Sequence, residues 1–255
     1  MMRSRTGFIC GAVVILFAMT LCPSRESAAQ ASESPAYRCS WEGWLPPSVG
    51  RERVRRAAHL DAAATADLRD RARSADKGSR LLVAERLGAA QDDASIQTLI
   101  ALTNDPDAMV REAAVRALGR AGATSATSVI ERLATSDNEH LRQGAVWALG
   151  QLQDQSAVNT LIAASRDTSK HVRDEATWAL GLIGGRAAAA RVKELALDSN
   201  PHVRLAAVCS LEKIHDVRDP RTRQILSGLS GDSVALVRET ARWAVARFAA
   251  APPIP

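Results

Sequence analysis

The sequence predicts an all-α fold, a right-handed superhelix of about six stacked helix pairs. Three observations favour it. A segment of about ten residues recurs along most of the chain, apolar residues within each copy are spaced four apart, and aromatic residues make up only 4% of the 255 residues. A spacing of four puts apolar side chains on one face of a helix, whereas β-sandwiches and barrels are rich in aromatic and β-branched residues.

Five copies of the recurring segment align clearly. They begin at Val110, Leu141, Val172, Val203 and Val237, so that successive copies are 31, 31, 31 and 34 residues apart. Each copy has an alanine four residues after its first residue, and the first four have a leucine eight residues after it. A sixth, weaker copy lies near residue 80. A fixed period of about 31 residues is typical of helical repeats, in which each unit buries its apolar face against its neighbours.

A second apolar segment precedes each copy and completes the repeating unit. Its main column lies eleven residues before each copy and holds Leu99, Ile130, Leu161, Val192 and Leu226. The unit is therefore a helix, a tight turn and a second helix. Glycine follows the leucine in four copies, where we expect it to end the second helix as a left-handed C-cap. These glycines are Gly88, Gly119, Gly150 and Gly181.

The chain divides into five segments. Residues 1–31 combine two early arginines, an uncharged apolar run of about fifteen residues (7–21) and small residues at 29 and 31, which is typical of a cleaved signal peptide. Residues 32–49 form an irregular arm that contains proline and tryptophan, residues 50–60 a charged capping helix, residues 61–248 the repeat solenoid, and residues 249–255 a C-terminal tail. We expect the mature protein to be exported, to a periplasm or beyond. An uncleaved membrane anchor stays an alternative, although the apolar run is shorter than the roughly 20 residues that a spanning helix needs.

Charge and cysteine content limit the classes of partner. Removing the signal peptide takes Arg3, Arg5, Arg25 and Glu26 with it, and the formal charge falls from +5 by 2 to +3. This excess is too small to indicate a nucleic-acid surface. Cys39 and Cys209 remain after cleavage, and export makes a disulfide between them possible, although their spacing does not decide it.

An aspartate stands six residues before an arginine in four of the copies, with valine directly before the arginine. With the Ala-Leu-Gly that follows in several copies, the pattern over roughly residues 61–248 resembles HEAT repeats, and the short period resembles the HEAT-like subtype also found in phycobilisome lyases. The resemblance implies that Asp and Arg form a ladder between neighbouring repeats and that the Arg-bearing helix lines the concave side. Ser136 takes the aspartate's place before Arg142, so we expect that ladder bond to be shifted or lost. The ladder residues are Asp105, Arg111, Arg142, Asp167, Arg173, Asp198, Arg204, Asp232 and Arg238.

A column that contains three tryptophans lies six positions after the start of each copy, well off the core stripe. It holds Arg116, Trp147, Trp178, Cys209 and Trp243. His140 and His171 lie seven residues before the first two tryptophans, and Asp174 and Glu175 edge the same stripe. The tryptophans permit two interpretations: rings packed flat over the neighbouring helix, or a partner-binding stripe, since tryptophan is enriched among binding hot spots.

The histidines do not predict a metal site. His140, His171 and His202 stand in register on successive repeats, but packed helices lie roughly 8–10 Å apart, too far for three layers to reach one ion. The sequence has no nucleophile elbow, phosphate-binding loop, Cys-x-x-Cys or His-Glu-x-x-His motif. We therefore expect no catalytic residue, metal or cofactor.

These observations predict an exported scaffold that binds a protein or peptide along its concave face, without catalysis of its own. Trp147, Trp178 and Trp243 would be the anchors, with His140, His171, Asp174 and Glu175 beside them. Two alternatives stay open, a lyase or metal-dependent oxidoreductase of the HEAT-like type and a membrane-anchored regulatory or sensor ectodomain. We expect no nucleic-acid partner, and contact with a membrane only if the N-terminal segment stays uncleaved.

Overall fold

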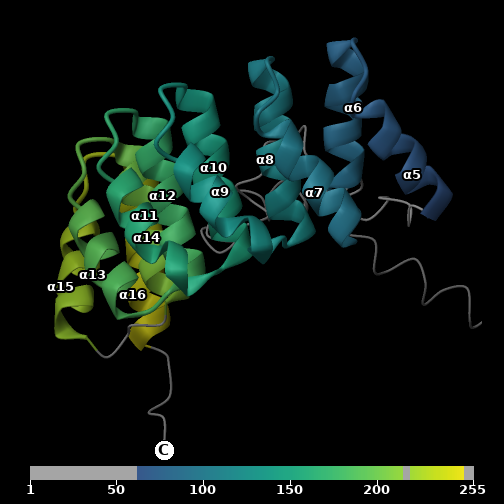
Figure 1. Cartoon of the computed structure of the whole chain (residues 1–255). Helices are drawn as coiled ribbons and strands as arrows, with labels where there is room; N and C mark the ends of the chain where they lie inside the picture. The colour runs from purple at the N-terminus through teal and green to yellow at the C-terminus, as the bar shows by residue number, and fades with distance from the viewer. Residues whose placement is uncertain (1–61, 215–218, 250–255) are drawn as a thin grey trace, which may run out of the picture. The chain divides into compact units, whose positions relative to one another are not determined.

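The computed structural model describes residues 62–214 and 219–249, and these form an all-α repeat fold (Figure 1). The described residues contain twelve α-helices, two short 3-10 helices and no strand. The helices form six pairs that stack in chain order, which confirms the predicted fold class. The pairs are α5 (Ala62–Arg71) and α6 (Lys77–Leu87), α7 (Asp93–Leu102) and α8 (Ala108–Ala121), α9 (Thr127–Leu133) and α10 (Glu139–Leu152), α11 (Val158–Ala164) and α12 (Lys170–Ile183), α13 (Arg186–Leu195) and α14 (Pro201–Lys213), and α15 (Pro220–Leu229) and α16 (Ala235–Ala249).

Several predicted segments lie outside the described residues. These are the signal peptide 1–31, the arm 32–49, the capping helix 50–60 and the tail beyond Ala249, which is the last residue of α16. Among the described helices, none combines the length and the apolar character that crossing a membrane requires.

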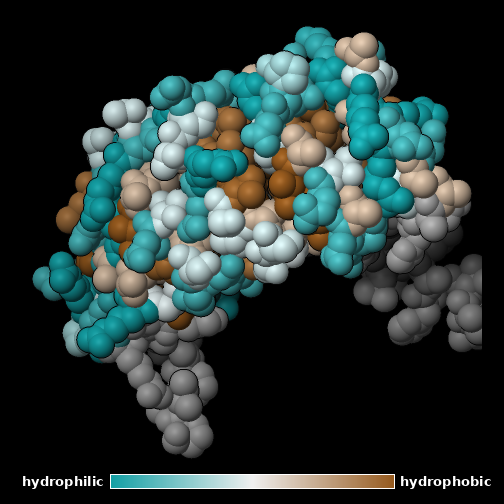
Figure 2. Space-filling model, in the orientation of Figure 1, coloured by the Kyte–Doolittle hydropathy of each residue, from teal (hydrophilic) through white to brown (hydrophobic). Residues whose placement is uncertain are grey.

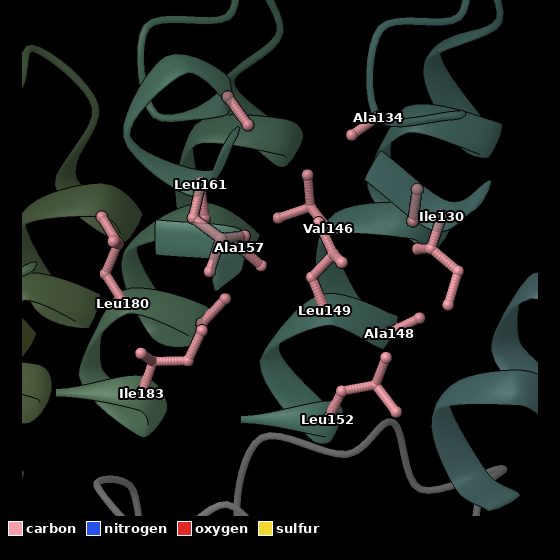
Figure 3. Close-up of a cluster of buried hydrophobic side chains, with 14 of the residues drawn as sticks. Ile130, Ala134, Val146, Ala148, Leu149, Leu152, Ala157, Leu161, Leu180 and Ile183 are labelled. Atoms are coloured by element: carbon pink, nitrogen blue, oxygen red, sulfur yellow. The ribbon is translucent and has the colours of Figure 1, made fainter. Parts of the chain in front are cut away.

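The core is a continuous row of aliphatic side chains between the helix pairs. Leu99 and its four equivalents in the first helices are all fully buried, as are Ala114 and Leu118 of α8. Figure 3 shows one part of this row, where Val146 and Leu149 of α10 lie between Ile130 of α9 and Leu161 of α11. The apolar spacing of four in the sequence is thus the stripe that each second helix buries.

The turns between paired helices are closed by side-chain N-caps. Asp107, Asn138, Ser169 and Asn200 precede α8, α10, α12 and α14, and each accepts a hydrogen bond from a backbone N–H in the first turn of its helix. Such a cap satisfies one of the donors that a helix start leaves unpaired. It also fixes the point at which each second helix begins, and therefore the register of the residues along it.

Three of the four glycines predicted to be C-caps have a different role, whereas Gly88 is the C-cap of α6, although with a right-handed φ of −61°. Gly119, Gly150 and Gly181 lie inside α8, α10 and α12, which continue for two more residues beyond each of them. The helices end instead at Gly122, Gln153 and Gly184, all with positive φ. At Gly119 a Cβ atom would stand 2.8 Å from the Cα of Ala148, closer than side chains pack. The glycine is therefore required by the close approach of the next helix and not by the helix end.

Successive repeats meet mainly through their second helices. We call α6, α8, α10, α12, α14 and α16 the second-helix row, because each packs against the next along the described chain, whereas neighbouring first helices contact each other little. Closer packing on one side of a stack of helix pairs favours that side as the concave one. Figure 2 shows a mostly hydrophilic surface in which hydrophobic residues are visible between helix pairs.

Candidate functional site

The tryptophan column lies on the second-helix row, but its members differ in burial. Trp147 on α10 and Trp243 on α16 are half-buried and pack against the core cluster. Trp178 on α12 is only 6% exposed, and Cys209 on α14 is fully buried and disulfide-bonded. Cys39, named above as a possible partner for Cys209, lies outside the described residues. Two of the three rings thus keep part of their surface accessible.

Trp147 is held between two helices. The guanidinium carbon of Arg116 on α8 lies 5.7 Å from the ring centroid, a cation–π distance. Arg116 also donates from Nε to Oε1 of Glu112 at 3.0 Å, a partly exposed ion pair on the same helix. The edge of the indole approaches Gly119, where an added Cβ would stand 3.1 Å from ring atom Cζ3. The ring therefore both packs against α8 and presents a face that an arginine covers.

Trp243, on the last helix of the row, is also covered by an arginine, here from its own helix. The guanidinium carbon of Arg247 lies 5.3 Å from the ring centroid, one helical turn further along α16. Arg247 also pairs with Glu212 of α14, Nε to Oε1, at 3.2 Å. Both half-buried tryptophans thus carry a cation that an acidic side chain holds in turn.

The histidine positions are exposed. His140 and His171 lie in the first turns of α10 and α12, and His202 occupies the same place on α14. In the part of the chain that the structure describes, no three His, Cys, Asp or Glu side chains come together in an arrangement that could hold a metal ion. The two histidines singled out for binding thus lie at the edge of the tryptophan column, near the turns.

Glu175 lies between helices rather than at the edge of a groove. It is 5% exposed, and the same position of the other second helices from α8 to α16 holds Ala113, Gly144, Ala206 and Thr240. Its carboxyl hydrogen-bonds with the side chain of Gln143 on α10 and lies near the charge of Arg116. Burial raises the pKa of Glu175 to about 8, more than the nearby arginine lowers it.

Asp174 adds a second carboxyl of the same kind. Burial, together with the charge of Asp198, raises the pKa of Asp174 to about 7. Its Oδ1 is buried and has no hydrogen-bond partner within the described residues. Two adjacent carboxyls of raised pKa therefore lie one helical turn before Trp178, and they are the most strongly perturbed acids of the candidate site.

The ladder residues lie apart from the tryptophan column, at the turns. Arg142 donates from Nε and Nη2 to the two carboxylate oxygens of Asp167 in the next repeat, at 2.8 and 3.0 Å. Its Nη1 donates to the backbone carbonyls of Ser136 and Asp137 in its own repeat. Each such arginine therefore links two neighbouring repeats. The same fork joins Arg80 to Asp105, Arg173 to Asp198 and Arg204 to Asp232.

The junction at Ser136 departs from this pattern. Arg142, the arginine that follows Ser136, makes both of its hydrogen bonds to the carboxylate of Asp167. The bond that is missing belongs to Arg111 of the preceding repeat, whose fork would need an aspartate at position 136. Among the described residues, Arg111 hydrogen-bonds only to two backbone carbonyls, those of Asp105 and Pro106. The ladder bond is thus lost, not shifted to Asp137.

Sequence reasoning missed several residues that shape the site. It did not single out Arg247, although the residue stands four positions after Trp243, a spacing that brings two side chains together on a helix. It placed Arg116 in the column but not over the ring of Trp147. Arg80 was noted as part of a weak copy but not as a ladder member.

Comparison with known proteins supports the architecture. A family model described as HEAT repeats matches residues 65–143 and 127–199, which together span more than half of the chain. No curated protein matches the sequence.

Solved structures with a similar fold come from natural and designed proteins. One is the complex of CpcE and CpcF of phycocyanin lyase from Nostoc sp. PCC7120, 21% identical, covering 69% of this chain and 74% of that one, with a TM-score of 0.55. A designed armadillo repeat protein in complex with the peptide (KR)4 is 18% identical, covers 71% and 98%, and has a TM-score of 0.54. An archaeal HEAT-like repeats protein from Thermococcus onnurineus NA1 is 16% identical, covers 75% and 82%, and has a TM-score of 0.50. At these identities the likeness concerns the fold alone.

Proposed function

The chain belongs to the HEAT-repeat family, and we propose that it is an exported scaffold that binds an extended segment of a partner protein along its second-helix row. Repeat proteins of this kind offer one small contact surface per repeat, and affinity accumulates over successive repeats. An extended segment suits such a surface because its side chains meet successive helices in turn.

One observation carries the proposal: Trp147 and Trp243 are half-buried on the second-helix row and each is covered by an arginine. Both rings pack against the core, yet each keeps part of its surface exposed, unlike Trp178 at the same register position. An arginine over the ring keeps the indole face from water and can move aside when a partner side chain arrives. Trp178 is buried, so we assign it a supporting role between these two anchors.

His140, His171 and Asp174 give the surface its polar contacts. The two histidines are exposed in the first turns of α10 and α12, and Asp174 lies partly exposed in the centre of the row, where Glu175 is buried between helices. Asp174 is partly exposed, so its carboxyl is the acid of the row that a donor from the partner can reach. The proposed contacts therefore combine aromatic anchors with an acceptor at the centre.

The solved structures of the same fold support this use of it. The designed armadillo repeat protein is in complex with a peptide, and CpcE is in complex with CpcF. Export rests on residues 1–31, which have the arrangement of a signal peptide. An envelope or extracellular protein is accordingly the class of partner that we propose.

The experiment is a selection of binding peptides followed by affinity measurement. Peptides selected from a random displayed library against the mature chain are titrated against wild type, Trp147→Ala and Trp243→Ala, with fluorescence anisotropy as the readout. We expect each tryptophan variant to weaken binding roughly tenfold or more, as removal of a hot-spot side chain does. Thermal unfolding of each variant, followed by circular dichroism, separates loss of binding from loss of folding.

Asn159→Ala is the matched control, because Asn159 is exposed on the first helix α11, outside the second-helix row. It should leave the affinity unchanged. Peptides that bind both tryptophan variants as tightly as wild type would refute the proposed surface. A loss of affinity that follows the loss of thermal stability in every variant would show that the rings serve packing.

A further inference from the structure

The ladder defines a carboxylate-binding geometry that this chain repeats four times. In one example, Asp167 accepts from Arg142 Nε at 2.8 Å and Nη2 at 3.0 Å, and from the backbone N–H of Ser169 at 2.8 Å. Asp105, Asp198 and Asp232 each accept the same three contacts, from an arginine fork and from the N–H two residues on. The carboxylate is thus held by three donors from two neighbouring repeats.

The junction between Arg111 and Ser136 has these donors without the carboxylate. Arg111 Nη1 donates to the carbonyl oxygens of Asp105 and Pro106 at 2.7 and 2.9 Å, the same anchoring that positions the other ladder arginines. Its guanidinium is therefore held in the orientation that directs Nε and Nη2 toward the next repeat. Within the described part of the chain, neither of these atoms has a hydrogen-bond acceptor.

The other side of the junction is also in place. Ser136 accepts from the backbone N–H of Asn138 at 3.3 Å, the contact that a ladder aspartate makes at 2.8–2.9 Å in the other repeats. Serine is shorter than aspartate and supplies a hydroxyl where the other repeats have a carboxylate. The hydroxyl can donate a hydrogen bond, so it adds a donor where aspartate has only acceptors.

This junction is open to solvent. The side chains of the four ladder aspartates are only 4–12% exposed, so the chain's own carboxylates fill their sites. Arg111, Ser136 and Asn138 are all partly exposed, and Asp137 beside them is exposed. A small group can therefore reach Arg111 from outside.

We propose that Arg111, Ser136 and the backbone N–H of Asn138 form a binding site for a carboxylate group from outside the chain. The incoming carboxylate takes the place of the missing aspartate, accepting from Arg111 Nε and Nη2 and from the donors at Ser136 and Asn138. An arginine fork matches the geometry of a carboxylate and binds it through two parallel hydrogen bonds. The site lies at the turns, apart from the tryptophan column, and does not depend on the proposed peptide surface.

The carboxylate can come from two sources, a small free carboxylate or an aspartyl side chain of a partner polypeptide. Sodium formate is the probe for the first. N-acetyl-aspartate N-methylamide is the probe for the second, and its asparagine counterpart is the control. A stronger effect of the aspartyl compound assigns the site to a polypeptide, whereas an effect of formate alone assigns it to a small free carboxylate.

The test compares thermal unfolding of the mature chain in formate and in chloride at equal ionic strength. We expect formate to raise the Tm of wild type above its value in chloride. Ser136→Asp should raise the Tm in chloride by roughly 2–4 °C, the shift expected from one added ion pair in a chain of this size, and should abolish the formate effect. In the described residues, Nε and Nη2 of Arg238 also have no acceptor, because no described repeat follows α16, and formate could bind there too. The formate response of the Arg111 site is therefore the part of the Tm increase that Ser136→Asp removes.

A direct readout does not depend on stability. In side-chain NMR spectra of 15N-labelled protein, the Nε–H resonance absent from Arg111→Lys is that of Arg111, and it should shift on titration with formate in wild type but not in Ser136→Asp. A second variant, Asp167→Ser, removes the carboxylate that accepts from Arg142 Nε and Nη2, and this variant should gain a second formate response. The proposal is overturned if neither formate nor the aspartyl compound acts differently from its control on wild type, or if Ser136→Asp responds to them as wild type does.

Discussion

Gly181 of α12 lies so close to Ser210 of α14 that a Cβ atom on the glycine would stand 2.4 Å from the serine hydroxyl oxygen and 3.0 Å from the serine Cα. The same relationship joins Gly119 to Ala148 and Gly150 to Ala179. At each of these junctions, a glycine in one second helix faces a small residue of the next. The pairs let the helices of the second-helix row approach closely near their C-terminal ends, and they therefore set the spacing of the tryptophan column.

Gly150→Ala tests this role, because helix propensity and close packing predict opposite effects. Propensity alone predicts that alanine stabilises the helix by about 1 kcal/mol. The added methyl would however stand 2.8 Å from the Cβ and 3.0 Å from the Cα of Ala179, and the backbone atom cannot move aside without shifting α12. We expect the overpacking to dominate and to lower the free energy of unfolding by about 1–3 kcal/mol, measured by urea denaturation.

Gly228→Ala is the matched control for this prediction. Gly228 also lies inside a helix, α15, but a Cβ there would meet nothing within 4 Å. Here propensity acts alone, and we expect a gain of about 0.5–1 kcal/mol. If Gly150→Ala stabilised the protein as much as Gly228→Ala does, close packing of the second helices would not be the reason for the glycine.

The glycines also show where sequence reasoning reaches its limit. The period of 31 residues and the apolar spacing of four are local patterns, and they correctly predicted paired helices and their buried columns. Glycine near a helix end has two physical uses: it can form a left-handed C-cap, or it can let a neighbouring helix approach closely. Both uses occur beside apolar residues, so the local sequence does not separate them. Only the position of the next helix distinguishes them, so Gly119 and Gly150 were assigned wrongly as caps.

The fork geometry of the ladder predicts that arginine and lysine are not equivalent at Arg173. Lysine cannot donate two parallel hydrogen bonds to Asp198, whose side chain is only 12% exposed, so Arg173→Lys leaves a largely buried carboxylate poorly paired. We expect a loss of about 1–2 kcal/mol in the free energy of unfolding. Arg111→Lys is the control, because Arg111 has no carboxylate partner among the described residues; its loss should stay below about 0.5 kcal/mol. Equal losses would mean that the contacts to backbone carbonyls, and not the fork, make the arginine necessary.

The candidate site was harder to predict than the fold, because, as with the glycines, the position of the neighbouring helices decides the outcome. Trp147, Trp178 and Trp243 share one register position, yet Trp178 is buried and the other two are half-buried. Glu175 was expected beside a groove but lies between helices, against Gln143. The register of a residue on its own helix follows from the sequence, whereas its burial depends on the residues of neighbouring helices.

The buried acids of α12 predict that the protein loses stability as the pH rises toward 8. Burial raises the pKa of Glu175 from its ordinary 4.5 to about 8 and that of Asp174 from 3.8 to about 7. Between the ordinary and the raised pKa, the unfolded chain has lost a proton that the folded chain keeps. Folding is therefore favoured below about pH 4.5, and this contribution is lost progressively up to about pH 8.

Glu175→Gln should remove part of this pH dependence. The amide is neutral at every pH and can keep the hydrogen bond with Gln143, so the variant should exceed wild type in stability above pH 8, by on the order of 2 kcal/mol, and match it near pH 4.5. Denaturation curves across this range give the comparison. Glu85→Gln, at an exposed position on α6, should show the pH dependence of wild type. A variant at position 175 that follows the wild-type pH profile would contradict the raised pKa of Glu175.

The state of Cys209 gives a test of export. Cys209 is fully buried and disulfide-bonded, and disulfides form and persist mainly outside the cytoplasm. We expect the native protein to lack residues 1–31, and its denatured but unreduced chain to leave Cys209 unreactive toward iodoacetamide until a reductant is added. Peptide mass spectrometry reads the new N-terminus and the labelling together. The peptide linked to Cys209 identifies its partner, for which the sequence leaves Cys39 once residues 1–31 are removed.

The control is a chain that starts at Ser32 after an initiator methionine and is made in the cytoplasm, in which Cys209 should be labelled without reduction. A native chain that keeps residues 1–31 and is labelled at Cys209 before reduction would rule out the proposed export.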